Sequence, residues 1–555
     1  MERDYTVTDK RTCRVELQQQ EFRARGLIAS LDFALSGTLR AGAAVIGALM
    51  LVWGCNPGSE ATDTVVTESG PVRGIHTGAV DEYLGIPYAA APVGERRWQP
   101  PQPHGPWQGV LEAFNFGSEC TQPGPSPGTT AGSENCLFLN VYRQHPARGA
   151  IPPRQLPVMV WIHGGGLTIL SGAFDVPPAL LEGGDVIVVS MNYRLGVLGF
   201  FAHPALDAEG HLNANYGLMD QQLALQWVRS NIAAFGGDPH RITIFGTSAG
   251  ALSVYSHLAS PTAAGLFHRA IAQSGSYAGL VNYEKLIVPL AEAETTGVAF
   301  ANKFDCATPS CLRAIPVTAL VAAEPSGNTY PIVDGAVLKE RPGAAFANGQ
   351  FNRVPVIAGN SHDDYRFVSA VEYDFGPGPL TPAEYPGAVA RMLRLPPSDP
   401  FVTTVLNQYP LSSYNGSAPI ALGAAGTDHD FACPALSGDR SLARWVPTYG
   451  YEFNDEHAPS FFDRPVSFPL GAYHSAEVLY LLDTHRLNAK QLRLSSAWIR
   501  YWTTFAANGD PNSPGAPVWP LFDPAAEAMQ SMKPPAPASE SGFATDHKCS
   551  FWLPG

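Results

Sequence analysis

One serine of the chain lies in a pattern that could make it a nucleophile. Residues 246–250 read Gly-Thr-Ser-Ala-Gly. They follow a short segment, 241–245, with apolar residues at Ile242, Ile244 and Phe245, and a helix-compatible run extends from Ala249 to Leu258. A buried strand that breaks sharply into a helix with serine at the corner is the nucleophile elbow, in which glycines leave room around the serine. The pattern predicts that Ser248 is a nucleophile and favours a serine hydrolase.

A second Gly-x-Ser-x-Gly match shows why the context of the motif matters. The chain has 54 glycines in 555 residues, so a chance match is expected, and residues 124–128 (Gly-Pro-Ser-Pro-Gly) supply one. This match contains two prolines, follows no strand pattern and precedes no helix pattern, so it predicts a loop. The match at Gly246 has the strand–turn–helix context that the motif requires.

An apolar strand followed by three glycines could stabilise the charge that such a nucleophile creates. Residues 158–162 are uninterruptedly apolar, which is typical of a strand buried on both faces, and residues 163–166 then read His-Gly-Gly-Gly. Fixed amide donors stabilise an oxyanion, and the loss of one typically costs about 3–4 kcal/mol. We predict an oxyanion hole formed by the N–H groups of Gly165, Gly166 and Ala249; the alternative is a plain flexible turn.

The segments around these motifs predict an α/β fold. Residues 185–190 repeat the buried-strand pattern, and residues 217–234 predict a helix that ends near Phe-Gly-Gly-Asp-Pro at 235–239. Strand, helix, strand and elbow in this order are typical of a parallel sheet with crossover helices. Residues 64–107, in contrast, predict short strands and turns, and residues 121–135 predict a loop that contains no aromatic side chain.

Composition and charge exclude some classes of protein. Hydrophobic residues make up 45% of the chain and aromatic residues 10%, which favours a globular protein with an extensive core over a disordered one. Charged residues are only 15%, and there are 54 glycines and 50 prolines, so many ordered loops are expected. The net charge of −14 and the lack of a basic run with interleaved aromatics disfavour a nucleic-acid partner.

An apolar segment near the N-terminus predicts export. Arg40 is followed by fourteen uncharged residues, 41–54, and then by Cys55. The run is too short for a membrane span, which needs about 20 residues, but a positive flank, a short apolar run and a small residue describe a signal peptide. The ending on Gly54 and Cys55 resembles a bacterial lipoprotein signal, in which the cysteine is lipidated; Trp53 is bulky for that motif. The alternative is a buried N-terminal helix.

These signals divide the chain into three parts. Residues 1–55 are predicted to be an N-terminal extension and signal peptide, residues 56–63 a tether, and residues 64–555 a single domain. Because the apolar segment begins about 40 residues into the chain, we expect that Met1 is not the biological start or that the leader is unusually long. The mature protein is expected to be periplasmic, secreted or anchored to the membrane through a lipidated Cys55.

The cysteines are consistent with export. Six remain when Cys13 and Cys55 are set aside, and none shows a zinc-like pairing with histidines: Cys120, Cys136, Cys306, Cys311, Cys433 and Cys549. An even number in an exported chain suggests disulfides, although six cysteines permit 15 connectivities. Pairing 120 with 136 and 306 with 311 is the simplest choice and leaves 433 with 549. The alternative is reduced, buried cysteine.

Together these motifs resemble the type-B carboxylesterase family, the cholinesterase-like branch of the α/β-hydrolases. The resemblance extends from about Thr64 to Trp552, and its blocks are residues 85–89, 133–141, 163–166, 217–221, 235–239, 246–250 and 505–512. It implies an α/β-hydrolase fold with a large, mostly parallel central sheet flanked by helices and long loop insertions around the active site. It also implies the three disulfide pairings above and hydrolysis of small-molecule carboxylic esters without a metal or organic cofactor.

The base that a nucleophilic serine needs is predicted from the resemblance. Such a serine transfers its proton to a base that a carboxylate orients, and in this fold the chain order is serine, acid, histidine. His474 lies in residues 471–477 (Gly-Ala-Tyr-His-Ser-Ala-Glu), which are similar to the histidine loop of the family. We therefore predict His474 as the general base; without the resemblance, His457 and His485 would be competitors.

The acid departs from the pattern of the family. The family usually has glutamate five residues after the glycine that corresponds to Gly359, where this chain has Asp364. Aspartate is shorter by one C–C bond, about 1.5 Å, so the loop must lie closer or the hydrogen bond must lengthen. Asp363 is the alternative acid, but neighbours in an extended segment point to opposite sides, so we predict Asp364. Ser274 matches a serine that supports the acid and histidine in the family; the alternative is a polar turn residue.

Some substrates and some functions are disfavoured. The cholinesterases carry glutamate before the nucleophile, where this chain has Thr247, and a tryptophan in the loop that corresponds to residues 121–135. A quaternary ammonium would lose its cation–π partner here, so a choline ester is not expected. A lipase or an amidase with the same triad is the nearest alternative. A non-catalytic binding module of the same fold is a further one, although such relatives characteristically lack the serine or histidine.

Overall fold

The computed structural model describes residues 61–553 except 127, 146–154, 176, 213, 277–285 and 325–328. The predictions for the N-terminal extension, the signal peptide and Cys55 therefore lie outside the described residues.

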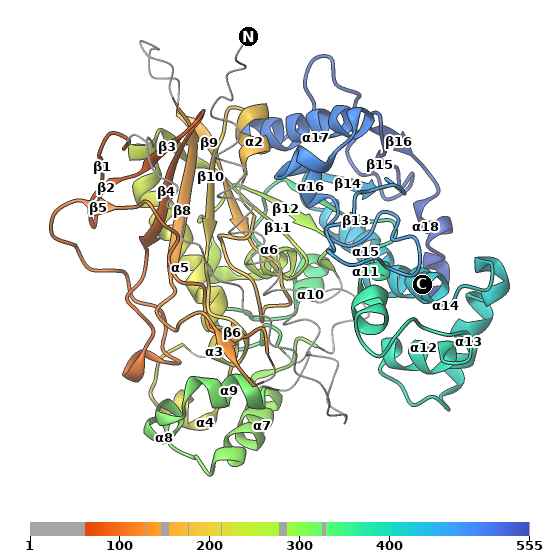
Figure 1. Ribbon diagram of the computed structural model, residues 1–555, viewed down its shortest axis with the longest axis horizontal. Helices are drawn as coiled ribbons and strands as arrows, with labels where there is room; N and C mark the ends of the chain where they lie inside the picture. Colours follow the sequence, from red (N-terminus) through yellow and green to blue (C-terminus); the bar gives the residue numbers. More distant parts are fainter. Residues whose placement is uncertain are drawn as a thin grey trace, which may run out of the picture.

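The centre of the molecule is one large twisted sheet (Figure 1). In spatial order its eleven described strands are β16 (Ala538–Glu540), β15 (Met529–Met532), β14 (Thr448–Phe453), β13 (Val356–Ser361), β12 (Arg269–Gln273), β11 (Gly237–Thr247), β9 (Leu156–Ile162), β10 (Ile187–Met191), β8 (Phe138–Gln144), β4 (Val80–Pro87) and β3 (Ile75–Thr77). The pairings from β10 through β15 are parallel, and those at the two edges are antiparallel. The predicted large, mostly parallel sheet is confirmed.

The apolar run in β9 is buried on both faces of this sheet, as the sequence predicts. Val158, Val160 and Ile162 pack into one core, together with side chains of α5 (Tyr216–Asn231) and α6 (Ala249–Ala259). Met159 and Trp161 point the other way and pack with α17 (Ala489–Asn508). The alternation follows from the two-residue period of a strand. Each such buried side chain contributes about 1.5–3 kcal/mol to stability, so both faces of the strand hold it in place.

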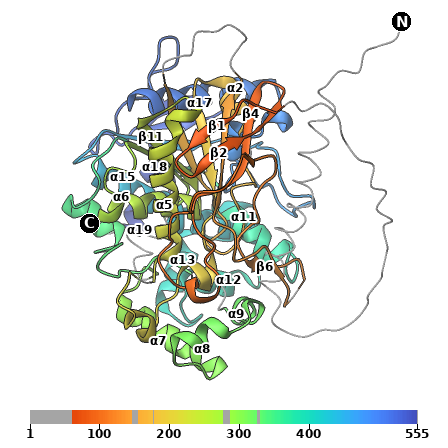
Figure 2. The same cartoon turned by 90° about the vertical axis from the view of Figure 1, so that its left-hand side faces the viewer.

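The remaining described helices cover the faces and ends of the sheet. They are α2 (Pro178–Gly183), α3 (Gly196–Gly199), α4 (Pro204–Asp207), α7 (Leu290–Ala301), α8 (Pro309–Ala314), α9 (Val317–Ala323), α10 (Pro342–Asn348), α11 (Tyr365–Ser369), α12 (Tyr385–Leu393), α13 (Pro400–Gln408), α14 (Ala418–Thr427), α15 (Cys433–Leu442), α16 (Val478–Leu481), α18 (Phe543–Asp546) and α19 (Cys549–Trp552). In both views α7, α8 and α9 lie at the end of the molecule opposite α17 (Figures 1 and 2). No described helix combines the length and the apolar character that a membrane crossing requires.

Two predicted elements differ from the sequence expectation at their ends. The strand before the elbow is β11, which begins at Gly237 and is longer than the predicted 241–245. The helix predicted for 217–234 is α5 followed by the 3₁₀ turn η2 (Ile232–Phe235). Gly236 ends this turn in the left-handed region, at φ 90°, which glycine adopts without steric cost. Gly236 and Gly237 therefore mark an abrupt change from helix to strand.

Short strands lie outside the central sheet, and two of them fall within residues 121–135, which the sequence predicts to be a loop. β1 (Val65–Thr67), β2 (Gly70–Arg73) and β5 (Leu111–Glu112) form a small sheet of their own. β6 (Gln122–Pro123) and β7 (Thr130–Ala131) pair beside the second Gly-x-Ser-x-Gly match. Thr129 N donates to Ser126 O within that match, so it is a turn and not an elbow.

Three disulfides connect the six cysteines as predicted. Cys120 bonds to Cys136, Cys306 to Cys311, and Cys433 to Cys549. The third encloses the longest segment, with a sequence separation of 116 residues, and joins the start of α15 to the start of α19. The alternative of reduced, buried cysteine is therefore wrong for these residues.

Candidate active site

The elbow lies between β11 and α6 and holds Ser248 in a strained backbone conformation. Ser248 has φ 58° and ψ −125°, a region that L residues rarely adopt, and its N–H donates to Gln273 O at 2.8 Å. A Cβ atom added at Gly246 would lie 2.5 Å from Ile162 O, and one at Gly250 would lie 2.0 Å from the same oxygen. Both flanking positions therefore require glycine, while Ser248 itself is partly exposed at the corner.

The glycine loop after β9 lies beside this corner because β9 and β11 are parallel neighbours. Ile162 of β9 pairs with Gly246 of β11, so the two strands end at the same edge of the sheet. A Cβ atom added at Gly164 would lie 3.2 Å from the Cβ of Ser248. The sheet register thus brings together two segments that are about 80 residues apart in the sequence.

The three predicted oxyanion donors have no acceptor among the described residues. Among the described residues, the N–H groups of Gly165, Gly166 and Ala249 donate no hydrogen bond. Gly165 and Gly166 have φ of 89° and 63°, and Ala249 is the first residue of α6, where helix N–H groups lack intrahelical partners. Amide groups of this kind, with the positive end of a helix dipole behind them, can stabilise an anion.

His163, which opens the glycine loop, is a buried neutral side chain. Burial lowers its pKa to about 4. Its ring stacks on Tyr193 at a centroid distance of 4.4 Å, and the Tyr193 hydroxyl donates to His163 O at 2.8 Å. These contacts hold the backbone of His163 in place at the start of the glycine loop, and with it the N–H groups that follow. The buried, neutral ring is not predicted to act as a base.

The predicted base and the predicted acid are in contact. His474 lies in the loop between β14 and α16, and its Nδ1 is 2.7 Å from Asp364 Oδ1. Its ring lies between Phe367 and Phe431, at centroid distances of 5.6 and 5.2 Å. Among the described hydrogen bonds, the competitors His457 and His485 make none to Ser248 or Asp364, and the His485 side chain is 53% exposed beside Asp483.

The two neighbouring aspartates point to different partners. Asp364 Oδ2 accepts hydrogen bonds from Ser274 Oγ at 3.0 Å and from the Ser361 N–H at 2.9 Å. Asp363 instead accepts from the Ala472 N–H at 3.0 Å and pairs with Arg366 at 2.9 Å. The contact between Asp364 and His474 has an ordinary length, so the loop lies close enough for the shorter aspartate. Ser274 orients the carboxylate, as the resemblance implies.

A buried glutamate that the sequence reasoning did not single out lies under the elbow. Glu477 is fully buried, and its Oε1 accepts from Thr247 Oγ1 at 2.8 Å and from Gln273 Nε2 at 3.4 Å. Burial raises the pKa of this carboxyl, and the nearby His474 opposes that shift. The only sequence signal for Glu477 was its position three residues after His474. Burial cannot be predicted from the sequence of a loop, because a loop lacks the regular apolar spacing of a helix or strand.

The arrangement can accept a proton from serine and stabilise an oxyanion, both at one corner of the sheet. Ser248 Oγ forms no hydrogen bond with any described residue, and catalytic hydrogen bonds often tighten only when substrate is bound. The imidazole is oriented from behind by Asp364, which leaves Nε2 as its second nitrogen for proton transfer.

Comparisons with known proteins identify a family and several relatives of this chain. The model of the carboxylesterase family matches residues 61–552. Cocaine esterase of Oryctolagus cuniculus is 35% identical over 495 residues, which cover 82% of this chain and 90% of the relative. Pyrethroid hydrolase Ces2a of Mus musculus is 33% identical over 88% of this chain and 91% of the relative. Acylcarnitine hydrolase of Rattus norvegicus is 33% identical over 88% of this chain and 90% of the relative.

Proposed function

Because this chain belongs to the carboxylesterase family and is a carboxylic ester hydrolase, we propose that Ser248, His474 and Asp364 carry out its chemistry. The observation that carries the proposal is the 2.7 Å contact between Asp364 Oδ1 and His474 Nδ1. Thr247, next to the strained Ser248, donates to Glu477, three residues after His474, which supports placing this pair near the serine. Serine, acid and base come from three separate segments that the sheet brings together.

The proposed reaction has two acyl-transfer steps. His474 Nε2 takes the proton of Ser248 Oγ while that oxygen attacks the ester carbonyl carbon, and Asp364 stabilises the resulting imidazolium. The tetrahedral intermediate collapses when His474 returns the proton to the alkoxy oxygen, which leaves as the alcohol. Water, deprotonated by His474, then attacks the acyl-enzyme, and the acid leaves as Ser248 recovers its proton.

The N–H groups of Gly165, Gly166 and Ala249 are proposed to hold the oxyanion in both steps. Because these N–H groups have no acceptor in the part of the chain that the structure describes, they are available to a substrate oxygen, which supports this role. The strain at Ser248 supports it as well, since strained backbone clusters at functional sites.

We propose that the substrates are small-molecule esters without a choline group. Residues 121–135 contain no aromatic side chain, and Thr247 donates its hydroxyl proton to Glu477 instead of presenting a carboxylate. A trimethylammonium group would lack a cation–π partner in this loop. A panel containing a nitrophenyl acetate, a choline ester, a carnitine ester, a long-chain triacylglycerol and an anilide would test this, with fastest turnover expected for the first. Fastest turnover of the triacylglycerol or the anilide would instead assign a lipase or an amidase.

We further propose that the protein is exported. Three disulfides support this, because they persist in oxidising compartments. The apolar segment 41–54 and Cys55 support a cleaved or lipidated N-terminus. Cell fractionation would test export, and a protein found only in the cytoplasm would contradict it. Mass spectrometry of the mature N-terminus would test the cleavage; an exported protein that still begins at Met1 would contradict a cleaved or lipidated N-terminus.

The catalytic assignment is tested by covalent labelling. A fluorophosphonate probe is expected to label the wild-type protein and S248A is expected to remain unlabelled, with kcat reduced on the order of 10⁶-fold. S126A is the matched control, since Ser126 stands in the second Gly-x-Ser-x-Gly match; it should label and turn over like the wild type. Labelling of S248A, or its loss in S126A, would refute the assignment of Ser248.

A further inference from the structure

Two clusters outside the candidate active site combine two histidines with a carboxylate. The edge cluster consists of His76, Asp81 and His145, and the C-terminal cluster consists of His362, Glu452 and His547. In each, one nitrogen or oxygen atom from every member lies within 4.8 Å of the others. Two imidazoles and a carboxylate are a ligand set of divalent transition metals, so each cluster needs to be considered as a metal site.

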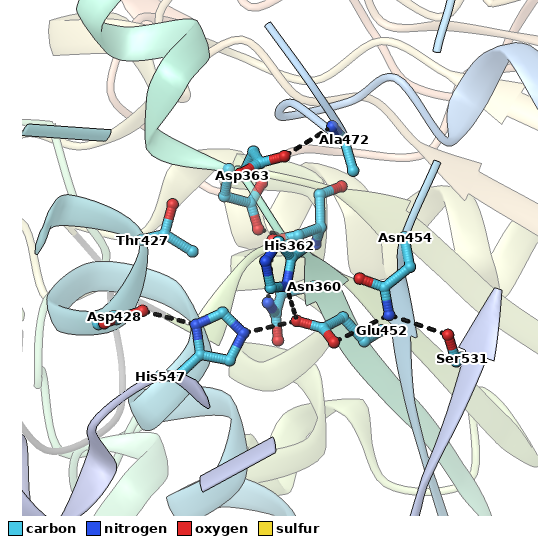
Figure 3. A network of polar contacts seen from close by, with 12 residues as sticks. Asn360, His362, Asp363, Thr427, Asp428, Glu452, Asn454, Ala472, Ser531 and His547 are labelled. Atoms are coloured by element: carbon cyan, nitrogen blue, oxygen red, sulfur yellow. Dashed lines mark hydrogen bonds and ion pairs between the residues drawn. The ribbon is translucent and has the colours of Figure 1, made fainter. Parts of the chain in front are cut away.

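In the C-terminal cluster, three distant parts of the chain converge on one carboxylate oxygen (Figure 3). Glu452 Oε1 is 2.5 Å from His547 Nε2 and 3.0 Å from His362 Nδ1. Glu452 belongs to β14, His362 follows β13, and His547 lies between α18 and α19. The His547 side chain is 3% exposed, whereas that of His362 is 40% exposed, so an ion could enter beside His362.

A second layer of hydrogen bonds orients two of these side chains. Asp428 Oδ1 is 2.5 Å from His547 Nδ1, so the Nδ1 proton is held by Asp428 and Nε2 faces Glu452 (Figure 3). Asn454 Nδ2 donates to Glu452 Oε2 at 3.0 Å and to Ser531 Oγ at 2.9 Å. A histidine whose second nitrogen donates to a carboxylate is the usual arrangement behind a metal ligand.

Charge distinguishes the two clusters. Within the described residues, the buried carboxylates of Asp428 and Glu452 form no ion pair with lysine or arginine, and their charged partners are histidines. Buried charges are costly unless they are compensated, so this cluster requires positive charge from protons or from a cation. In the edge cluster, Arg143 Nε is 3.0 Å from Asp81 Oδ2, so arginine already supplies the positive charge. At the C-terminal cluster the compensating charge therefore comes from histidine protons or from a bound cation, and no arginine or lysine of the described residues competes with either.

We propose that His362 Nδ1, Glu452 Oε1 and His547 Nε2 bind a divalent transition ion of the Zn²⁺ type. Asp428 hydrogen-bonds to the other ring nitrogen of His547, and Asn454 donates to the other carboxylate oxygen of Glu452. Water completes the coordination of the ion on the exposed side of His362. The ion competes with protons for the same positions, so binding strengthens as the pH rises above neutrality. His362 stands two residues before Asp364, so the ion ties the loop of the acid to β14 and to the C-terminal segment.

The proposal is tested on untagged mature protein that has been stripped with a chelator and dialysed at pH 7.5. Competition with a chromophoric chelator is expected to show one equivalent of bound Zn²⁺, and Co²⁺ should give visible absorption bands of a site with nitrogen and oxygen ligands. H362N and E452Q are expected to lower the affinity at least tenfold. H76N, the matched change in the edge cluster, should bind as the wild type does. These readouts are independent of esterase activity, so their failure would leave the assignment of Ser248 untouched.

Three outcomes would overturn the proposal. They are wild-type protein that binds no stoichiometric metal, H362N and E452Q that both keep wild-type affinity, and a loss of binding in H76N. Because His362 is partly exposed, H362N is expected to fold, and equal Tm values of the metal-free wild type and variant check this. Added Zn²⁺ should then raise the Tm of the wild type alone.

Discussion

At the scale of single residues, two adjacent aspartates contact different parts of the molecule. One contacts the proposed base, and the other contacts the neighbouring loop. Asp364 contacts His474, whereas Asp363 contacts Arg366 and the backbone of Ala472. The sequence predicts this division because adjacent residues in an extended segment face opposite sides. The 2.7 Å contact shows in addition that the Asp364 carboxylate reaches His474 although aspartate is shorter than glutamate.

The first prediction compares these two neighbours. D364N is expected to lower kcat on the order of 10⁴-fold, because an amide favours the wrong histidine tautomer and does not stabilise the imidazolium. D363N is expected to keep kcat within about tenfold, since its contacts are to Arg366 and Ala472 and not to the base. Steady-state kinetics with a nitrophenyl ester checks both. An inactive D363N beside an active D364N would reverse the assignment.

The second prediction concerns the hydrogen bond between Thr247 and Glu477. T247V is expected to reduce the free energy of unfolding by about 1–3 kcal/mol, because a buried carboxylate loses its nearest donor. Urea unfolding measures the change. T247S keeps the hydroxyl and should lie much closer to the wild type; if both variants were equally destabilised, the hydrogen bond would not be the cause.

Some residues at this site could be predicted from the sequence, and others could not. Ser248 and Gly165 could be predicted as site residues from motifs, because the chemistry predicted for them constrains the neighbouring residue types. Glu477 was not singled out, because nothing in its neighbours distinguishes a carboxylate that is buried under the elbow from one in solvent. The contacts of His547 depend on β14, almost a hundred residues earlier, and the local pattern holds no information about them.

At the scale of elements, uninterrupted apolar runs made the central strands predictable. β9 and β10 are bounded on both sides by clear changes of residue type, and the structure shifts their predicted ends by only a few residues. β14 (Thr-Tyr-Gly-Tyr-Glu-Phe) is fully buried although it contains glycine and glutamate, so its sequence does not show the usual buried pattern. Its glutamate is tolerated because His362 and His547 contact it.

The third prediction concerns the glycine loop after β9. A Cβ atom at Gly165 would lie 2.3 Å from Ile169 O, so G165A must move the loop and its donors; a loss of roughly 10²–10³ in kcat is expected. At Gly166 the same atom would lie 3.6 Å from Thr168 Oγ1, so G166A should lose less, with a backbone cost of about 1–2 kcal/mol at its positive φ. Kinetics of both variants with one ester checks this, and equal losses would argue against a special position for Gly165.

At the scale of the whole molecule, buried histidines make the stability of the fold depend on pH. His257 lies in α6, between the sheet and α5, and its Nε2 is 2.7 Å from Gln221 Oε1. Burial lowers its pKa to about 3, below the value of about 6.5 in the unfolded chain. Between these two values the unfolded state binds the extra proton, so the contribution of His257 to stability falls as the pH falls through this window.

The fourth prediction follows from this sign. When the pH is lowered from 6.5 to 4.5, the free energy of unfolding of the wild type should fall by about 2 kcal/mol more than that of H257Q, which cannot take up the proton. Glutamine can still donate toward Gln221. Urea unfolding of both proteins at the two pH values measures the difference, and parallel losses in the two proteins would show that His257 is not the responsible group.

The disulfide between Cys433 and Cys549 has a consequence for proteolysis of the chain. It encloses His474 but neither Ser248 nor Asp364, so the proposed base lies inside a covalent ring and its two proposed partners lie outside it. A single backbone cut between residues 434 and 548 opens this ring but leaves one covalent molecule. The cut protein should migrate as a single species on a non-reducing gel and separate into two fragments only after reduction. The fragments that carry Ser248 and His474 therefore stay covalently linked even if the cut separates them.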